Sequence, residues 1–234
     1  MSSPSTPWAG ASLVALLALI GCDARRAAPT TSDAPSLSGA WRIGAGTNPD
    51  GSGYSGRVEV RDAGGNYLIA WEVAGILPYH GVGLRLGDWL AAARAPGDDA
   101  ELIAYEVDGG HLVGRSAAMR APGKLGVETL EGRPGVSGSY RIVTARAAGG
   151  GSYAGRVTIT PTGPSLRLRW ELGAATLEGV GLLEGRMLVA GRASSGAGVA
   201  LYHRAGASLE GRWATSRSAT LGSETLERSD AAAD

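Results

Sequence analysis

Three histidines are the side chains of this sequence best suited to acid–base chemistry near neutral pH. They are His80, His111 and His203, and none stands at the spacing of a zinc site. The signatures of a nucleophilic serine or a phosphate-binding loop (Gly-x-Ser-x-Gly, Ser-x-x-Lys and the P-loop) do not occur in the sequence. We therefore expect a protein that is not an enzyme and has no catalytic residue, cofactor or metal. An enzyme that pairs one histidine with nearby carboxylates is an alternative.

The elements that would position such residues belong to an internal duplication, with copies about 97 residues long. The matching segments are Leu37–Ile43 with Val136–Ile142, Trp71-Glu72 with Trp170-Glu171, and Glu128–Glu131 with Glu224–Glu227. Single-residue differences in loop length separate the copies, which predicts one fold used twice. We place the two domains at residues 37–132 and 133–228.

Hydrophobic residues alternate with polar ones inside each copy, which is the period of a β-strand. Tyr67, Ile69, Trp71 and Val73 share one face of the clearest strand. Glycine or proline interrupts every apolar stretch after Ile20, so long helices are not expected. The sequence predicts an all-β protein with about eight short strands per copy.

A small antiparallel up-and-down β-barrel would leave no exposed strand edge in either copy. A β-sandwich is the alternative. Closure within a copy pairs its first and last strands, which would set Arg42 opposite Glu128 as a cross-strand ion pair. Strands this short predict a lumen largely filled with side chains, so we expect a shallow loop surface rather than a deep pocket.

Tight turns alternate with longer loops along both copies, and the longer loops of an up-and-down barrel gather at one end. Loop residues that differ between the copies are the best candidates for a binding site. They are Asn48, Asp50, Tyr79, His80, Asp98, Asp99, Arg120 and Lys124 in the first copy, and Arg146, Glu178, Arg192 and Arg217 in the second. The alternative is that these residues are only solvated turn positions.

Two short patterns carry a family resemblance. Gly39-Ala40-Trp41, with Arg115 late in the copy, resembles the Gly-x-Trp and basic residue of the calycins, which include lipocalins and avidins. The segment from Gly46 to Gly56 resembles the Gly-Thr-Asn-Pro-x-Gly-x-x-Tyr-x-Gly pattern of poorly characterised exported bacterial repeat domains. The resemblance implies an exported β-barrel domain and brings no established activity with it.

The N-terminal region has the pattern of an export signal. The apolar run Ala9–Ile20 is too short to span a bilayer. Leu19-Ile20-Gly21-Cys22 resembles a bacterial lipobox, which implies that residues 1–21 are a signal peptide and that Cys22, the only cysteine, is lipidated. Residues 22–36 have the composition of a flexible tether, and 229–234 that of a disordered tail.

The charge balance argues against one class of partner. Lysine and arginine together number 22, as do aspartate and glutamate, and no basic stripe is visible, so we expect no nucleic-acid partner. The leading hypothesis is a monomer with two pseudo-equivalent domains, anchored by lipid to a bacterial membrane in the cell envelope or at the surface. Its loops would bind a small hydrophobic molecule, a glycan or an envelope protein without catalysis. A structural envelope lipoprotein without a ligand is the alternative.

Overall fold

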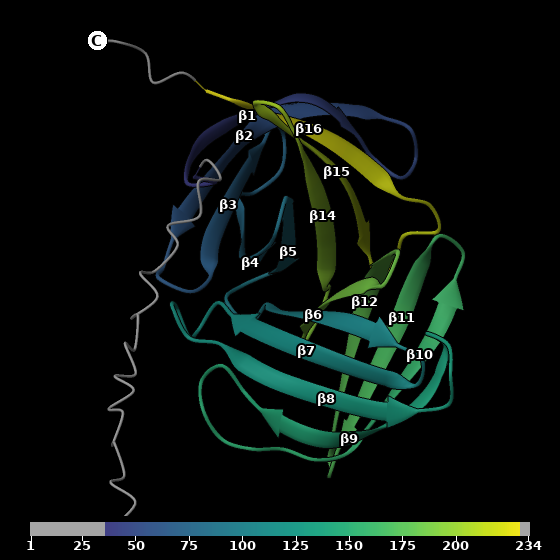
Figure 1. Ribbon diagram of the computed structural model, residues 1–234. Coiled ribbons are helices and arrows are strands. Elements are labelled where there is room, and N and C mark those ends of the chain that lie inside the picture. The colour runs from purple at the N-terminus through teal and green to yellow at the C-terminus, as the bar shows by residue number, and fades with distance from the viewer. Residues whose placement is uncertain (1–35, 230–234) are drawn as a thin grey trace, which may run out of the picture. The chain divides into compact units, whose positions relative to one another are not determined.

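Residues 36–229, which are the residues that the computed structural model describes, form sixteen β-strands and no helix (Figure 1). The strands are β1 (Gly39–Thr47), β2 (Gly53–Asp62), β3 (Tyr67–Val73), β4 (Tyr79–Leu86), β5 (Trp89–Ala95), β6 (Glu101–Asp108), β7 (His111–Ala118), β8 (Gly126–Gly132), β9 (Gly138–Arg146), β10 (Arg156–Thr162), β11 (Ser165–Leu172), β12 (Ala175–Glu184), β13 (Met187–Ala193), β14 (Gly198–Ala205), β15 (Ser208–Thr215) and β16 (Gly222–Arg228). The predicted signal peptide, Cys22, nearly all of the tether and the last five residues of the tail lie outside the described residues.

The strands close into two antiparallel eight-stranded barrels, which confirms the predicted fold class. One barrel is an uninterrupted meander of β6 to β13, and we call it the continuous barrel. The other contains β1 to β5 and β14 to β16, and we call it the discontinuous barrel. The chain leaves the discontinuous barrel after β5, builds the whole continuous barrel, and returns at β14 (Figure 1).

This topology corrects the expected domain boundaries, because the barrels do not coincide with residues 37–132 and 133–228. Each barrel takes five strands from one copy and three from the other. β8 pairs with β9, the first strand of the next copy, and β1 pairs with β16. The joint between β8 and β9 is short enough for a hairpin, and strands that follow each other in sequence usually pair.

The exchange also corrects the expected ion pair of Arg42. Arg42 lies opposite Glu227 of β16 and forms an exposed ion pair with it. Glu128 is instead fully buried in the continuous barrel. The equivalent pair in that barrel joins Arg141 to Glu131 at 2.7 Å.

The lumen of each barrel is packed with alternate side chains of its strands, as the period of two predicts. In β3, Ile69, Trp71 and Val73 are buried and Glu72 is exposed. A glycine on the neighbouring strand makes room for the indole ring: a Cβ at Gly81 would lie 2.9 Å from Trp71 Cζ3 and 2.1 Å from the carbonyl oxygen of Ala93. Bulky aromatic residues therefore fill these lumens because facing positions are small.

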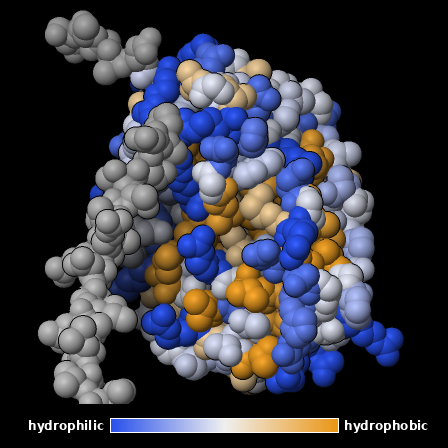
Figure 2. Space-filling model, in the orientation of Figure 1, coloured by the Kyte–Doolittle hydropathy of each residue, from blue (hydrophilic) through white to orange (hydrophobic). Residues whose placement is uncertain are grey.

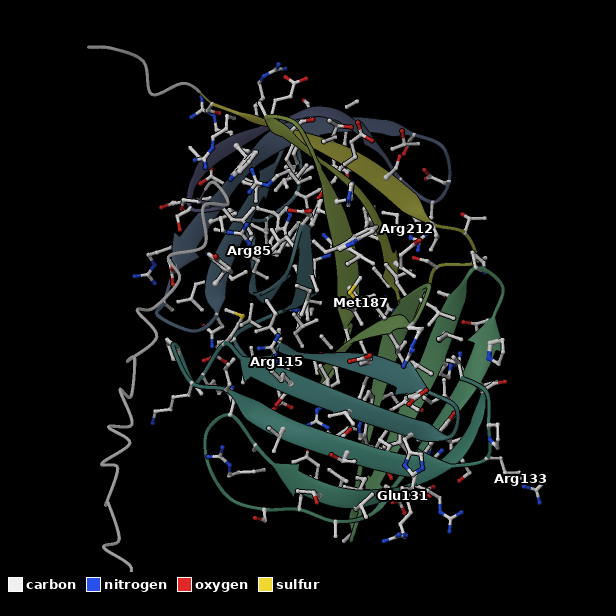
Figure 3. All side chains as sticks on the ribbon, viewed as in Figure 1. Arg85, Arg115, Glu131, Arg133, Met187 and Arg212 are labelled. Carbon is white, nitrogen blue, oxygen red and sulfur yellow. The ribbon has the colours of Figure 1, made fainter. Side chains whose placement is uncertain are left out.

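The two barrels also share an apolar interface made by outward-facing residues of both. Its buried members are Val82, Leu84, Ala91, Ala93, Leu102, Ala104, Ala117, Val180, Leu182, Val189, Val199, Leu201 and Ala214. Figure 2 shows apolar residues gathered on one face of the protein, and Figure 3 labels Met187, which packs against this cluster. The chain passes between the barrels twice, from β5 to β6 and from β13 to β14. A hydrogen bond joins these two connections, in which the backbone nitrogen of Ser194 donates to Asp99 at 2.8 Å.

Candidate functional site

A cavity of about 530 Å³ opens at the loop-bearing end of the discontinuous barrel. It is lined by Asn48, Tyr54, Val73, Ile76, Leu77, Pro78, Tyr79, Arg94, Ala95, Pro96, Gly97, Gly196, Trp213 and Thr215. The loop between β3 and β4 forms an apolar rim, where Ile76 is 58% exposed and Leu77 is 86% exposed. Large apolar side chains left in water beside a cavity of this size are typical of a ligand-binding mouth.

Aromatic side chains from both sequence copies meet at the inner end of this cavity. The rings of Trp71 and Tyr79 are stacked with centroids 5.4 Å apart, and the edge of Tyr54 meets Trp213 at 6.4 Å. Trp213 Nε1 donates to the Tyr54 hydroxyl at 2.9 Å. These contacts hold the rings in fixed positions before any ligand enters.

A buried carboxylate anchors the same aromatic group. Glu224 accepts a hydrogen bond from the Tyr54 hydroxyl at 2.8 Å and another from Tyr202, and Trp71 Nε1 donates to the Tyr202 hydroxyl at 3.4 Å. Burial, followed by the charge of Glu224, raises the pKa of both tyrosines well above the usual range. The phenols therefore stay protonated and serve as donors, not as acids or bases.

Arg94 brings a positive charge to the cavity wall. Its guanidinium carbon lies 4.3 Å from the ring centroid of Tyr79 and 4.7 Å from that of Trp213. Burial raises the pKa of Tyr79, and the neighbouring charge of Arg94 opposes this shift. Within residues 36–229, no ion pair joins Arg94 to a carboxylate.

The equivalent arginine of the continuous barrel is neutralised inside the protein. Arg192 is 4% exposed, and its Nε lies 2.5 Å from Glu101, the residue opposite it on β6. Its Nη1 lies 3.9 Å from Glu128. Burial disfavours the charge on Arg192, but these carboxylates more than offset it, and the pKa of Arg192 is raised.

The two barrels differ because each combines strands from both copies, so that equivalent residues face different partners. In the discontinuous barrel, Arg94 lies opposite Gly198, whereas Arg192 in the continuous barrel lies opposite Glu101. Two aromatic residues of the cavity also have non-aromatic equivalents in the other barrel: Trp213 corresponds to Ser116, and Tyr79 corresponds to Leu177. Closure within each copy would have put Arg94 with Glu101 and separated Tyr79 from Trp213. The exchange therefore brings Arg94, Tyr79 and Trp213 together at one cavity.

The structure brings only two of the sequence-predicted candidates, Asn48 and Tyr79, to this cavity. Asp50 caps its own turn by accepting hydrogen bonds from Ser52, which hold the pKa of Asp50 below its usual value. His80 follows Tyr79 in β4 and borders a different surface hollow. These positions agree with strand alternation, which turns neighbouring side chains to opposite faces.

The remaining candidates lie elsewhere. Asp98 and Arg120 form an exposed ion pair at 2.6 Å, and Asp99 accepts from Ser194. Lys124 belongs to a loop whose carbonyl oxygens accept hydrogen bonds from Asn66, so this loop docks against the other barrel. The candidates from the second copy do not line the cavity either; they are Arg146, Glu178, Arg192 and Arg217.

Sequence reasoning missed Arg94 and Trp213 as site residues. Arg94 lies in β5, just before the loop, and its equivalent Arg192, which was a candidate, does not in fact differ from it in residue type. Trp213 is 8% exposed and packs in the core of the discontinuous barrel. For Trp213 a signal was available in the difference from its equivalent Ser116. For Arg94 the signal was a difference at the residue opposite it, namely Gly198 in place of Glu101. That signal has meaning only when the pairing of strands is known.

No protein family, curated protein or solved structure matches this chain. The fold defines the chain as a pair of small antiparallel β-barrels, and the discontinuous barrel has a cavity at its mouth. No helix in residues 36–229 has the length and apolar character needed to cross a membrane. The same residues contain no group of three or more His, Cys, Asp and Glu side chains placed to hold a metal ion.

Proposed function

We propose that this protein is a non-catalytic binding protein that holds a small, largely apolar molecule in the mouth of the discontinuous barrel. The observation that carries the proposal is the cavity of about 530 Å³ with an exposed apolar rim and fixed aromatic rings at its inner end. Pockets of this size accept small-molecule ligands, and preformed rings bind them with little ordering cost.

The rim residue Leu77 tests the proposal. Replacing Leu77 with aspartate should weaken the binding of decanol about tenfold, because a leucine that the bound ligand partly covers contributes roughly 1–2 kcal/mol of apolar contact. Isothermal titration calorimetry measures the affinity. The matched control is Val113→Asp, which changes another exposed apolar residue in the continuous barrel and should leave decanol binding unchanged.

Two outcomes would count against the proposed site. Equal effects of the two substitutions would place binding outside the cavity. If decanol and its charged analogues all fail to bind, the ligand-binding function is wrong, and a structural role without a ligand becomes the better explanation.

We also propose that the protein is exported and anchored by lipid to a bacterial membrane through Cys22. Support comes from the lipobox-like Leu19-Ile20-Gly21-Cys22. In bacteria fed radiolabelled palmitate, the protein should carry the label and fractionate with membranes, and Cys22→Ser should abolish the label. Labelling that survives this substitution would contradict the anchor.

A further inference from the structure

We propose that Arg94 recognises the carboxylate of a small organic acid whose apolar part occupies the mouth cavity. This inference rests on the proposed function and adds the chemical class of the ligand. It follows from the comparison of two equivalent arginines in one chain, one of which has a protein carboxylate as its partner.

The continuous barrel shows what this arginine position accepts. Arg192 lies opposite Glu101 in the strand register, and the distance from its Nε to the Glu101 carboxylate is 2.5 Å. In the discontinuous barrel the residue opposite Arg94 is Gly198. A side chain is missing at the place where the other barrel has its carboxylate, and Arg94 itself lines the cavity. A ligand carboxylate can therefore occupy the position that Glu101 occupies in the equivalent site.

The surroundings of Arg94 favour an anion over a neutral group. Arg94 is half-buried against Tyr79 and Trp213, whose rings attract its charge without neutralising it. A guanidinium has five N–H donors, and a carboxylate can accept two of them in parallel. Partial removal of water strengthens such a pair relative to one on an open surface.

The side chains that line the cavity indicate the chemistry of the rest of the ligand. Except for Asn48, Arg94 and Thr215, the lining side chains are apolar, aromatic or glycine. A molecule that carries one carboxylate on an apolar body complements both parts of this surface. A sugar would leave most of its hydroxyl groups without hydrogen-bonding partners here.

Three probes with the same apolar chain test the inference at neutral pH by isothermal titration calorimetry: decanoate, decanol and decylamine. Decanoate should bind at least about tenfold more tightly than decanol, because a charge-assisted hydrogen bond contributes that much or more, and decylamine should bind most weakly. Binding of decanol as tight as that of decanoate would overturn the carboxylate assignment but leave the proposed function intact. Failure of all three probes would remove the proposed function itself.

The other barrel supplies a matched pair of variants. Gly198→Glu installs the residue that stands opposite Arg192, so it should neutralise Arg94 and lower decanoate affinity about tenfold or more without reducing decanol affinity as much. Gly198→Ala is the control. Its Cβ would lie 3.0 Å from Arg94 Nε, as in the glutamate variant, but it adds no charge, so decanoate should still bind more tightly than decanol.

Arg94→Gln provides an independent variant and should bring decanoate down to the affinity of decanol. Thermal unfolding of each variant, followed by circular dichroism, shows at which temperatures the variant is folded. Binding is compared only at those temperatures. A folded Gly198→Glu or Arg94→Gln variant that still prefers decanoate over decanol by the original factor would overturn the role of Arg94.

Discussion

Replacing Glu128 with alanine is expected to lower the free energy of unfolding by about 3–5 kcal/mol, the usual cost of removing one partner of a buried charged network. The Glu128 side chain is fully buried in the continuous barrel. It accepts hydrogen bonds from the hydroxyl of Tyr153 at 2.6 Å, from Nε1 of Trp170 at 3.1 Å, and from Tyr105.

Removal of this carboxylate leaves three donors in the lumen without their acceptor and takes one of two carboxylates from Arg192. Burial is the main cause that raises the pKa of Tyr105 well above its usual range, and this cause remains in the variant, so the phenol does not ionise to replace the lost charge. Denaturation by urea, followed by circular dichroism, measures the change. A loss of this size is a large part of the stability of an ordinary domain.

Glu131→Ala is the matched control, since Glu131 lies on the same strand and pairs with Arg141 at 2.7 Å on the outside of the barrel. Its side chain is 41% exposed, so we expect the loss to stay below about 1 kcal/mol. Equal losses for the two substitutions would mean that the buried network of Glu128 contributes no more than a surface ion pair.

Cutting the chain between the two sequence copies is the second change with a large expected effect. A protease site inserted between Arg133 and Pro134 would lie in the exposed joint that connects β8 and β9. After cleavage, the two pieces should elute together in size-exclusion chromatography. They should separate only at denaturant concentrations that unfold the strands.

The physical reason is that the copies are joined by backbone pairing in both barrels. β1 pairs with β16 and β5 with β14 in the discontinuous barrel, whereas β6 pairs with β13 and β8 with β9 in the continuous barrel. Separation of the pieces therefore requires both barrels to open. The uncut insertion variant is the control for the insertion itself. Pieces that separate in native buffer while each keeps its strand signal would contradict the exchanged pairing.

Much of the fold follows from local patterns. The alternate positions Ile69, Trp71 and Val73 predict which face of β3 is buried, and the bulky tryptophans of both barrels are buried as well: Trp41, Trp71, Trp170 and Trp213. Alternation works because a slip of one residue would exchange the two faces of a strand. The closed barrels follow from the need to leave no strand edge exposed.

The candidate site was less predictable. Loop residues such as Asp50 and Arg120 differ between the copies, but their partners are local: Asp50 binds Ser52, and Arg120 pairs with Asp98. Tyr79 reaches the cavity because its side chain points inward from the start of β4, while His80 points to the other face. Composition and loop position do not distinguish these two outcomes, whereas the exact register of the strand does.

By itself, the sequence determined the strands, their buried faces and the presence of two similar barrels, because these depend on a period of two and on turn residues along the chain. Only the tertiary structure decided which copy provides the last three strands of each barrel. Similar copies offer similar edges for pairing, so local sequence cannot choose between closure within a copy and exchange between copies. The exchange places Arg94 opposite Gly198 and beside Trp213, and the open charged cavity depends on that choice.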